Sequence, residues 1–172
     1  GVATQMGNQG RSSEGHRQTI EWLRDGAIGA VREVHAWSGR ARSARSQPPP
    51  QGPARKPSRL NWDLWLGPRA DRAFSGSYAP FVWRWWWDFG GGTLADMGAH
   101  NFDPAFNALG LDAPLTIEAR GSEIDRERSV GSHMVIYQFG GRADRGPITA
   151  YWYDNGLQAP TPLGVDPDDA RQ

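Results

Sequence analysis

The chain has 172 residues, no cysteine and no net charge at neutral pH, since 19 basic residues balance 19 acidic ones. Its length suits one domain that buries roughly 70% of the surface of the unfolded chain, and nine tryptophans supply apolar area for a core. The composition excludes disulfide bonds and thiolate metal ligands, and it argues against a nucleic-acid-binding surface. No apolar run reaches the ~20 residues that a membrane span needs.

The first part of the chain contains one predicted helix and one predicted strand. Residues 1–10 are typical of a strand end followed by a turn. Ser12–Glu14 places capping serines before an acidic residue, so a helix is predicted to start there and to stop at Gly26. The composition of Val31–Ser38 predicts a strand. Residues 39–60 hold five prolines and six basic residues, which indicates a solvated loop rather than a nucleic-acid site.

A second helical region follows an aromatic-rich, irregular stretch over residues 61–89. Gly90–Gly92 leads to Thr93, which we expect to cap a helix. Pro104 cannot lie inside a regular helix, so either this helix kinks or Asp103 caps a second short helix beginning at Pro104. Apolar residues recur along one side of the predicted helix: Leu94, Met97, Gly98, Phe102, Ala105, Phe106 and Leu109.

Three strands are predicted in the last third of the chain, over residues 116–121, 133–139 and 148–153. Residues 158–172 are rich in proline and aspartate, and we expect a disordered tail. The strands gather late and their connections favour antiparallel pairing. The fold class is therefore α+β, with an open, predominantly antiparallel sheet and helices on one face.

The side of the predicted helix opposite its apolar residues carries candidate catalytic groups. Asp96, His100 and Asp103 lie at positions i, i+4 and i+7, and with Asn107 they fall within about 40° of one line along the helix. Such a helix can present acid–base groups to a cleft. A histidine suits proton abstraction at neutral pH, and a carboxylate one turn earlier can hold its ring.

Each of these residues also has a structural interpretation. Thr93 and Asp96 form a near-capping box at the helix start. His100 is compatible with a solvated position, and Asp103 with an N-cap. A metal site shared by Asp96, His100 and Asp103 is not favoured, because no fourth ligand is evident nearby. The remaining histidines are interpreted as structural: His16, His35 and His133.

Three further residues are candidates for substrate or cofactor binding. Trp83 offers a flat ring to a sugar or a nicotinamide, and Arg84 offers hydrogen-bond donors to an anion or a hydroxyl group. Asn8 follows a strand end, where it either contacts the cofactor or satisfies a turn, and we favour the contact. Trp86 and Trp87 are expected to serve packing.

Four segments together resemble the Gfo/Idh/MocA (glucose–fructose oxidoreductase / inositol dehydrogenase) family: Gln5–Gly10, Trp62–Pro68, Trp83–Gly90 and Asp96–Asp103. The resemblance implies the C-terminal α+β domain of a two-domain dehydrogenase that acts on a sugar or polyol with NAD or NADP. It also implies that His100 is the general base, supported by Asp96. In this family one face of the open sheet carries substrate residues and the other often forms an oligomer contact.

The sequence departs from the family pattern in two ways. No G-x-G-x-x-G fingerprint follows a predicted strand. The family's Glu-Lys-Pro motif is also missing, because Lys56 and Pro57 follow Arg55 in the proline-rich loop. We therefore expect a Rossmann domain upstream that binds most of the NAD or NADP, with residues 1–10 ending its last strand and 11–157 forming the substrate-binding domain. The chain alone is expected to be inactive.

Two other functions remain open. Some relatives use NAD transiently to cleave glycosides or eliminate a group, and His100 would serve that chemistry too. A non-catalytic carbohydrate-binding or oligomerisation module is the other. The expected partners are a sugar or polyol substrate and further copies of the chain through the open sheet, with no nucleic acid and no membrane. Localisation stays open between the cytoplasm, slightly preferred, and export directed by an upstream signal.

Overall fold

A computed structural model describes residues 1–39, 52, 54–122, 125–129 and 131–166. The four predicted strands correspond to the four strands of the structure, three of them with the same bounds, while the first is shorter by at most two residues at each end. The first helix is capped by the Ser13 side chain, which accepts from the His16 N–H. In chain order the elements are η1 (Gln9–Ser12), α1 (Glu14–Arg24), β1 (Glu33–Trp37), α2 (Trp62–Leu66), η3 (Val82–Trp85), α3 (Gly92–Asn101), α4 (Asp103–Leu109), β2 (Thr116–Gly121), β3 (His133–Phe139) and β4 (Ile148–Tyr153).

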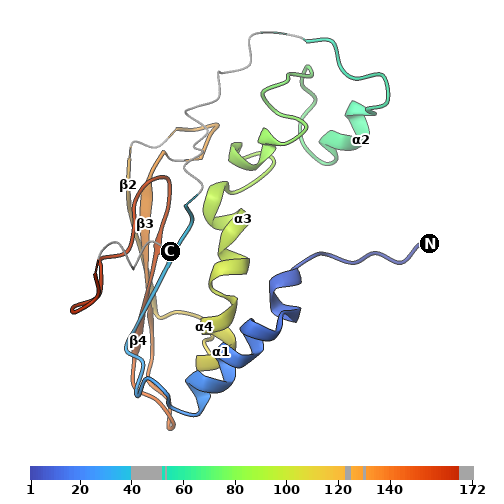
Figure 1. The fold of residues 1–172 in the computed structure, drawn as a ribbon. Helices are drawn as coiled ribbons and strands as arrows, with labels where there is room; N and C mark the ends of the chain where they lie inside the picture. Colours follow the sequence, from blue (N-terminus) through green and yellow to red (C-terminus); the bar gives the residue numbers. More distant parts are fainter. Residues whose placement is uncertain (40–51, 53, 123–124, 130, 167–172) are drawn as a thin grey trace.

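The strands form one open four-stranded sheet in the order β1-β4-β3-β2. The pairs β2–β3 and β3–β4 are antiparallel, whereas β1 runs parallel to β4. Helices α1, α3 and α4 lie on one side of this sheet, and α2 lies apart from it (Figure 1). The predicted open, mostly antiparallel sheet is confirmed, with one parallel pair at β1.

The main core lies between the sheet and the α3–α4 helices. Alternate residues of β3 and β4 face the helices, and Trp152 is fully buried among them. Phe102 enters this core from the helix junction, where its ring centroid lies 5.8 Å from that of Trp152. Truncating a buried aromatic side chain of this kind to alanine costs about 3–5 kcal/mol. The predicted apolar side of the helix therefore packs on the sheet, although Phe106 stays 38% exposed.

The helical region is divided into two helices at Phe102, the C-cap of α3 and the N-cap of α4. Pro104 lies in the first turn of α4, where its missing N–H leaves no hydrogen bond unmade. Asp103 belongs to the same turn, so the prediction that it caps α4 is wrong. The predicted Thr93 cap is also wrong. Gly91 is the N-cap of α3, and Thr93 is buried, with its hydroxyl outside any capping bond.

A second cluster of large side chains lies beside α2. Trp62 and Leu66 of this helix pack with Tyr78 and Trp86, and Trp86 is only 2% exposed. The packing role predicted for Trp86 is therefore confirmed. Backbone hydrogen bonds from this region reach residues 125–129, including Ser129 N–H to Trp85 O at 2.8 Å. The cluster thus supports η3 next to the start of α3.

Two predicted irregular stretches fall partly outside the described residues. Of the loop over 39–60, residues 40–51 and 53 are outside, and 54–60 contain no helix or strand. Of the tail over 158–172, residues 167–172 are outside, and 158–166 contain a turn but neither helix nor strand. Within the described ranges, no helix combines the length and apolar character needed to cross a membrane.

Candidate active site

One side of α3, together with η3 and the first residues of the chain, lines a pocket of about 230 Å³. Five of the six candidate residues predicted from the sequence line it, and the sixth, Asp103, does not. We call it the His100 pocket. Its lining residues are Met6, Gly7, Asn8, Trp83, Arg84, Gly90, Gly91, Gly92, Ala95, Asp96, Ala99 and His100.

The imidazole of His100 is held by Asn8. Its Nδ1 lies 2.8 Å from Asn8 Oδ1, although 92 positions separate the two residues in the chain. The other ring nitrogen, Nε2, makes no hydrogen bond with any residue that the structure describes. His100 is partly buried. One side of the ring is therefore fixed while the other remains available to a bound molecule.

Asp96 is held by Arg84. Arg84 Nε donates to Asp96 Oδ1 at 3.0 Å, and the two side chains are 24% and 29% exposed. No hydrogen bond or ion pair joins Asp96 to His100, both of which the structure describes. The expectation that Asp96 contacts the imidazole directly is therefore corrected. Asn8 contacts the ring, and Asp96 forms an ion pair with Arg84 of η3.

Arg84 is itself enclosed by aromatic rings. Its guanidinium carbon lies 4.3 Å from the ring centroid of Phe81 and 4.9 Å from that of Trp83, and Nη1 donates to Phe81 O at 3.0 Å. The two hydrogen bonds, to Asp96 and Phe81, use two of the five N–H donors that the sequence had suggested for an anion or a hydroxyl group. Arg84 thus fixes Asp96 and covers one side of Trp83.

Glycines bring η3 close to the start of α3. A Cβ on Gly90 would lie 2.6 Å from Arg84 O, and Gly90 N–H donates to Trp86 O at 2.7 Å. Gly92 has φ +74°, and a Cβ there would lie 2.8 Å from Ser129 Cβ. Only glycine permits this approach without moving backbone. The segment therefore sets the distance between Arg84 and the α3 residues of the pocket.

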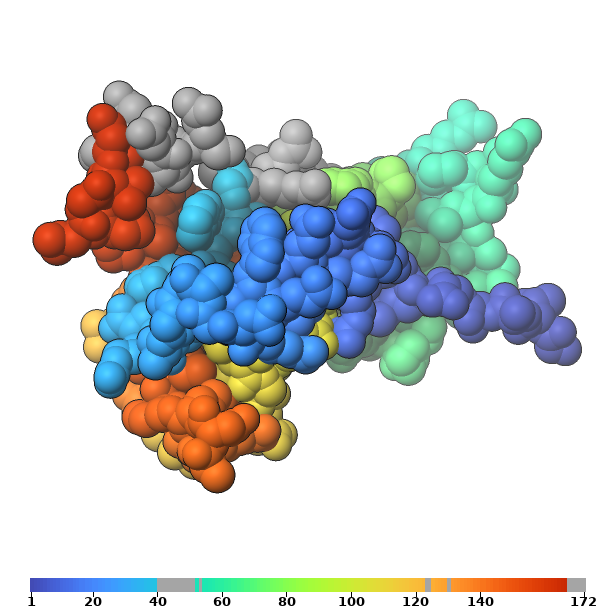
Figure 2. All heavy atoms as spheres, turned by 60° about the horizontal axis from the view of Figure 1, so that its bottom comes forward, coloured from blue at the N-terminus to red at the C-terminus, as the bar shows by residue number. Residues whose placement is uncertain are grey.

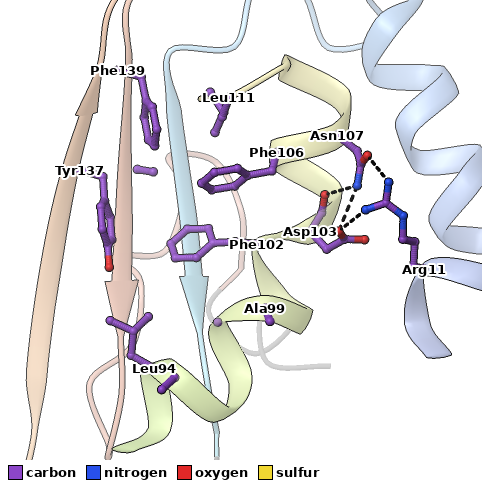
Figure 3. A pocket seen from close by; sticks show the side chains of 13 residues that line it. Arg11, Leu94, Ala99, Phe102, Asp103, Phe106, Asn107, Leu111, Tyr137 and Phe139 are labelled. Carbon is purple, nitrogen blue, oxygen red and sulfur yellow. Dashed lines mark hydrogen bonds and ion pairs between the residues drawn. The ribbon is translucent and has the colours of Figure 1, made fainter. Parts of the chain in front are cut away.

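Asp103 ties α1 to α4. Its Oδ1 accepts from Arg11 Nη1 at 2.9 Å, and its Oδ2 lies 3.0 Å from His16 Nε2. Arg11 also donates to Asn107 Oδ1, as the dashed lines in Figure 3 show. α1 lies across this part of the molecule in Figure 2. Both carboxylate oxygens of Asp103 thus contact α1 or the residues leading into it, outside the His100 pocket, and its binding role stays a prediction.

A larger pocket of about 690 Å³ lies between α3–α4 and the sheet (Figure 3). Aromatic side chains dominate its walls, including Phe102, Phe106 and Tyr137. Burial raises the pKa of the Tyr137 phenol above its ordinary value, so this group stays protonated at neutral pH. The charged residues at its edge, Arg11 and Asp103, are bonded to each other. The His100 pocket is thus the better candidate for proton transfer.

The other histidines have structural partners. His35 stacks on Tyr151 with ring centroids 4.7 Å apart, and its Nδ1 lies 3.0 Å from the Tyr153 hydroxyl. His133 Nδ1 lies 2.9 Å from Oδ1 of Asp154, which is completely buried. Among the residues with described positions, no group of three or more His, Asp or Glu is arranged to hold a metal ion.

Several contacts of the candidate residues were not apparent from the sequence. Arg11 and Phe81 were not singled out, yet Arg11 bonds to Asp103, outside the His100 pocket, and Phe81 contacts Arg84 within it. The contact of Arg11 joins residues of two different elements, and the spacing of residues within one helix does not predict such contacts. The hydrogen bond between Asn8 and His100 was missed for the same reason.

Comparison with known protein families identifies one match. Residues 35–142, more than half of the chain, match the Gfo/Idh/MocA model described as "Oxidoreductase family, C-terminal alpha/beta domain". The matched range includes Trp83, Arg84, Asp96 and His100, whereas Asn8 precedes it. The comparison with curated proteins found no match.

Proposed function

The chain belongs to the Gfo/Idh/MocA oxidoreductase family, as its C-terminal alpha/beta domain, and on this premise we propose that it is the substrate-binding and catalytic half of an NAD(P)-dependent enzyme. The substrate is a sugar, a polyol or a related hydroxyl compound. The observation that carries the proposal is the His100 pocket, in which Asn8 holds one imidazole nitrogen and no residue with a described position bonds to the other.

In the proposed reaction, His100 Nε2 takes the proton of a substrate hydroxyl group as hydride leaves the same carbon. Family members are typically NAD(P)-dependent, and the nicotinamide supplies the hydride acceptor when bound. General-base catalysis by a positioned histidine contributes about 10²–10⁴-fold to the rate. Asp96 Oδ1 is taken by Arg84, which leaves Oδ2 to accept a hydrogen bond from a second substrate hydroxyl.

The residues of the His100 pocket fit the reactive end of the cofactor and substrate but not a whole dinucleotide. The pocket measures about 230 Å³, below the ~300–1,000 Å³ of typical small-molecule sites. The sequence also lacks the G-x-G-x-x-G turn that binds a pyrophosphate at a helix start. We therefore assign nucleotide binding to a Rossmann domain in the full gene product, connected through residues 1–10.

The side of the sheet away from the helices is proposed as a contact between copies of the chain. The rings of His35, Tyr151 and Tyr153 stack there. Trp37 lies two residues after His35 in β1, so its side chain is on the same side of the sheet, where it is 44% exposed. Aromatic side chains are enriched at protein interfaces. Sedimentation should detect an oligomer that Trp37→Glu dissociates. A monomeric wild-type protein would contradict this assignment.

The catalytic proposal is tested on the full gene product with sugars and polyols and with NAD or NADP. Net formation of reduced nicotinamide that is lost in His100→Gln and kept in His35→Gln would support the catalytic proposal. His35→Gln is the control variant, because His35 lies on the side of the sheet away from the His100 pocket. Substrate conversion without net reduced nicotinamide would instead support glycoside cleavage or elimination. Ligand binding without turnover, unchanged in His100→Gln, would support a non-catalytic module.

A further inference from the structure

We infer that Asn8 is a positioning residue that holds His100 in the tautomer with Nδ1 protonated and Nε2 as the proton acceptor. The statement about the tautomer concerns the chain itself, while its consequence for catalysis rests on the function proposed above. Neutral imidazole carries its proton on one nitrogen only, and the hydrogen bond made by one nitrogen determines the state of the other.

The direction of the hydrogen bond follows from both ends of the Asn8 amide. Oδ1 lies 2.8 Å from His100 Nδ1, and Nδ2 lies 3.4 Å from Ala99 O. The carbonyl of Ala99 can only accept, so the amide nitrogen faces it and the amide oxygen faces the ring. Since Oδ1 can only accept, the hydrogen between the two side chains belongs to His100 Nδ1.

Other neighbours do not compete for this role. Asp96, the carboxylate one turn earlier on α3, is engaged by Arg84 at 3.0 Å. In the described part of the chain, Asn8 is the one side chain hydrogen-bonded to His100. An amide oxygen orients an imidazole without a formal charge, unlike the carboxylate that orients the base in serine-protease triads.

Asn8 is held in place by the residues that follow it. Arg11 lies three positions later and is anchored to Asp103 and Asn107 of α4 at 2.9 Å each. Because α4 continues directly from α3, this anchor fixes the start of the chain against the helix that carries His100. The Arg11–Asp103 contact, which the sequence did not predict, therefore serves to bring Asn8 to the imidazole.

The tautomer is measured by ¹⁵N NMR of the imidazole rings in this chain, at a pH where histidine is neutral. His100→Gln assigns the His100 signals. In wild type we expect the Nδ1-protonated form. Asn8→Ala should shift His100 toward the Nε2-protonated form, whereas Asn8→Asp, which keeps an acceptor, should preserve Nδ1-protonation. Gln9→Ala is the matched control, because Gln9 is adjacent and makes no side-chain hydrogen bond to any described residue.

Two results would overturn the inference: Nε2-protonation of His100 in wild type, or unchanged Nδ1-protonation in Asn8→Ala. In the full gene product, Asn8→Ala should lower kcat by about 10–100-fold with little change in KM, because misplacement of a catalytic group costs rate rather than binding. A full-rate His100→Gln enzyme with the expected tautomer would refute the proposed function and leave the tautomer assignment intact.

Discussion

Replacing Gly90 by alanine should force η3 away from the start of α3. The added Cβ would lie 2.6 Å from Arg84 O, 2.8 Å from Arg84 Cα and 2.9 Å from Arg84 C. All three contacts are with backbone, so no side-chain rotation relieves them. Overpacking of this kind costs about 1–3 kcal/mol. Alanine also lowers the conformational entropy of the unfolded chain, which stabilises the folded state by about 0.4–1 kcal/mol. The net destabilisation is therefore about 1–2 kcal/mol.

Urea unfolding followed by circular dichroism measures this loss as a lower midpoint at unchanged slope. Gly76→Ala is the matched control, because a Cβ at Gly76 meets nothing within 4 Å and its φ is not positive. That variant should be as stable as wild type or slightly more so. If Gly90→Ala unfolds at the same urea concentration as Gly76→Ala, η3 does not approach α3 as closely as the structure places it.

Three further predictions concern single contacts. A double-mutant cycle with Arg84→Leu and Asp96→Asn, measured by urea unfolding, should give a coupling of about 0.5–1 kcal/mol, because the pair is partly exposed; additive effects would rule out the ion pair. Burial raises the pKa of Tyr137, so its contribution to stability holds below the ordinary value of about 10 and is lost as the pH rises through the folded-state pKa. Wild type should therefore lose more stability than Tyr137→Phe above about pH 10, and equal losses in urea unfolding would count against burial of the phenol. Calorimetry on this chain alone should detect no NAD binding at micromolar affinity, because no dinucleotide fingerprint is present. Binding with a micromolar dissociation constant would refute the assignment of nucleotide binding to a Rossmann domain.

Strands and helix boundaries were predictable where local chemistry decides them. Residues 116–121, 133–139 and 148–153 form β2, β3 and β4 as predicted, and Pro104 divides the helical region. The parallel pairing of β1 with β4 was not predictable, because it joins segments more than 100 residues apart. The Thr93 cap failed for a related reason: α3 begins at Gly92 with Gly91 as its N-cap, so Thr93 lies inside the first turn, and the packing of Gly92 against Ser129 comes from a distant part of the chain.

The candidate site was predictable in membership but not in its contacts. Helical periodicity places Asp96, His100 and Asp103 on one line, yet it does not say which side chains approach from other elements. Arg84 from η3 takes Asp96, and Arg11 takes Asp103. The helix break at Phe102 then divides the predicted line into a pair of residues in the His100 pocket and a pair bound to α1 or the segment before it.

The central claim, that His100 transfers the proton, is tested most directly by kcat of the full gene product at saturating substrate and cofactor. We expect His100→Gln to lower kcat by about 10²–10⁴-fold, with KM and the urea midpoint close to those of wild type. A kcat within threefold of wild type in a correctly folded His100→Gln enzyme would contradict the account.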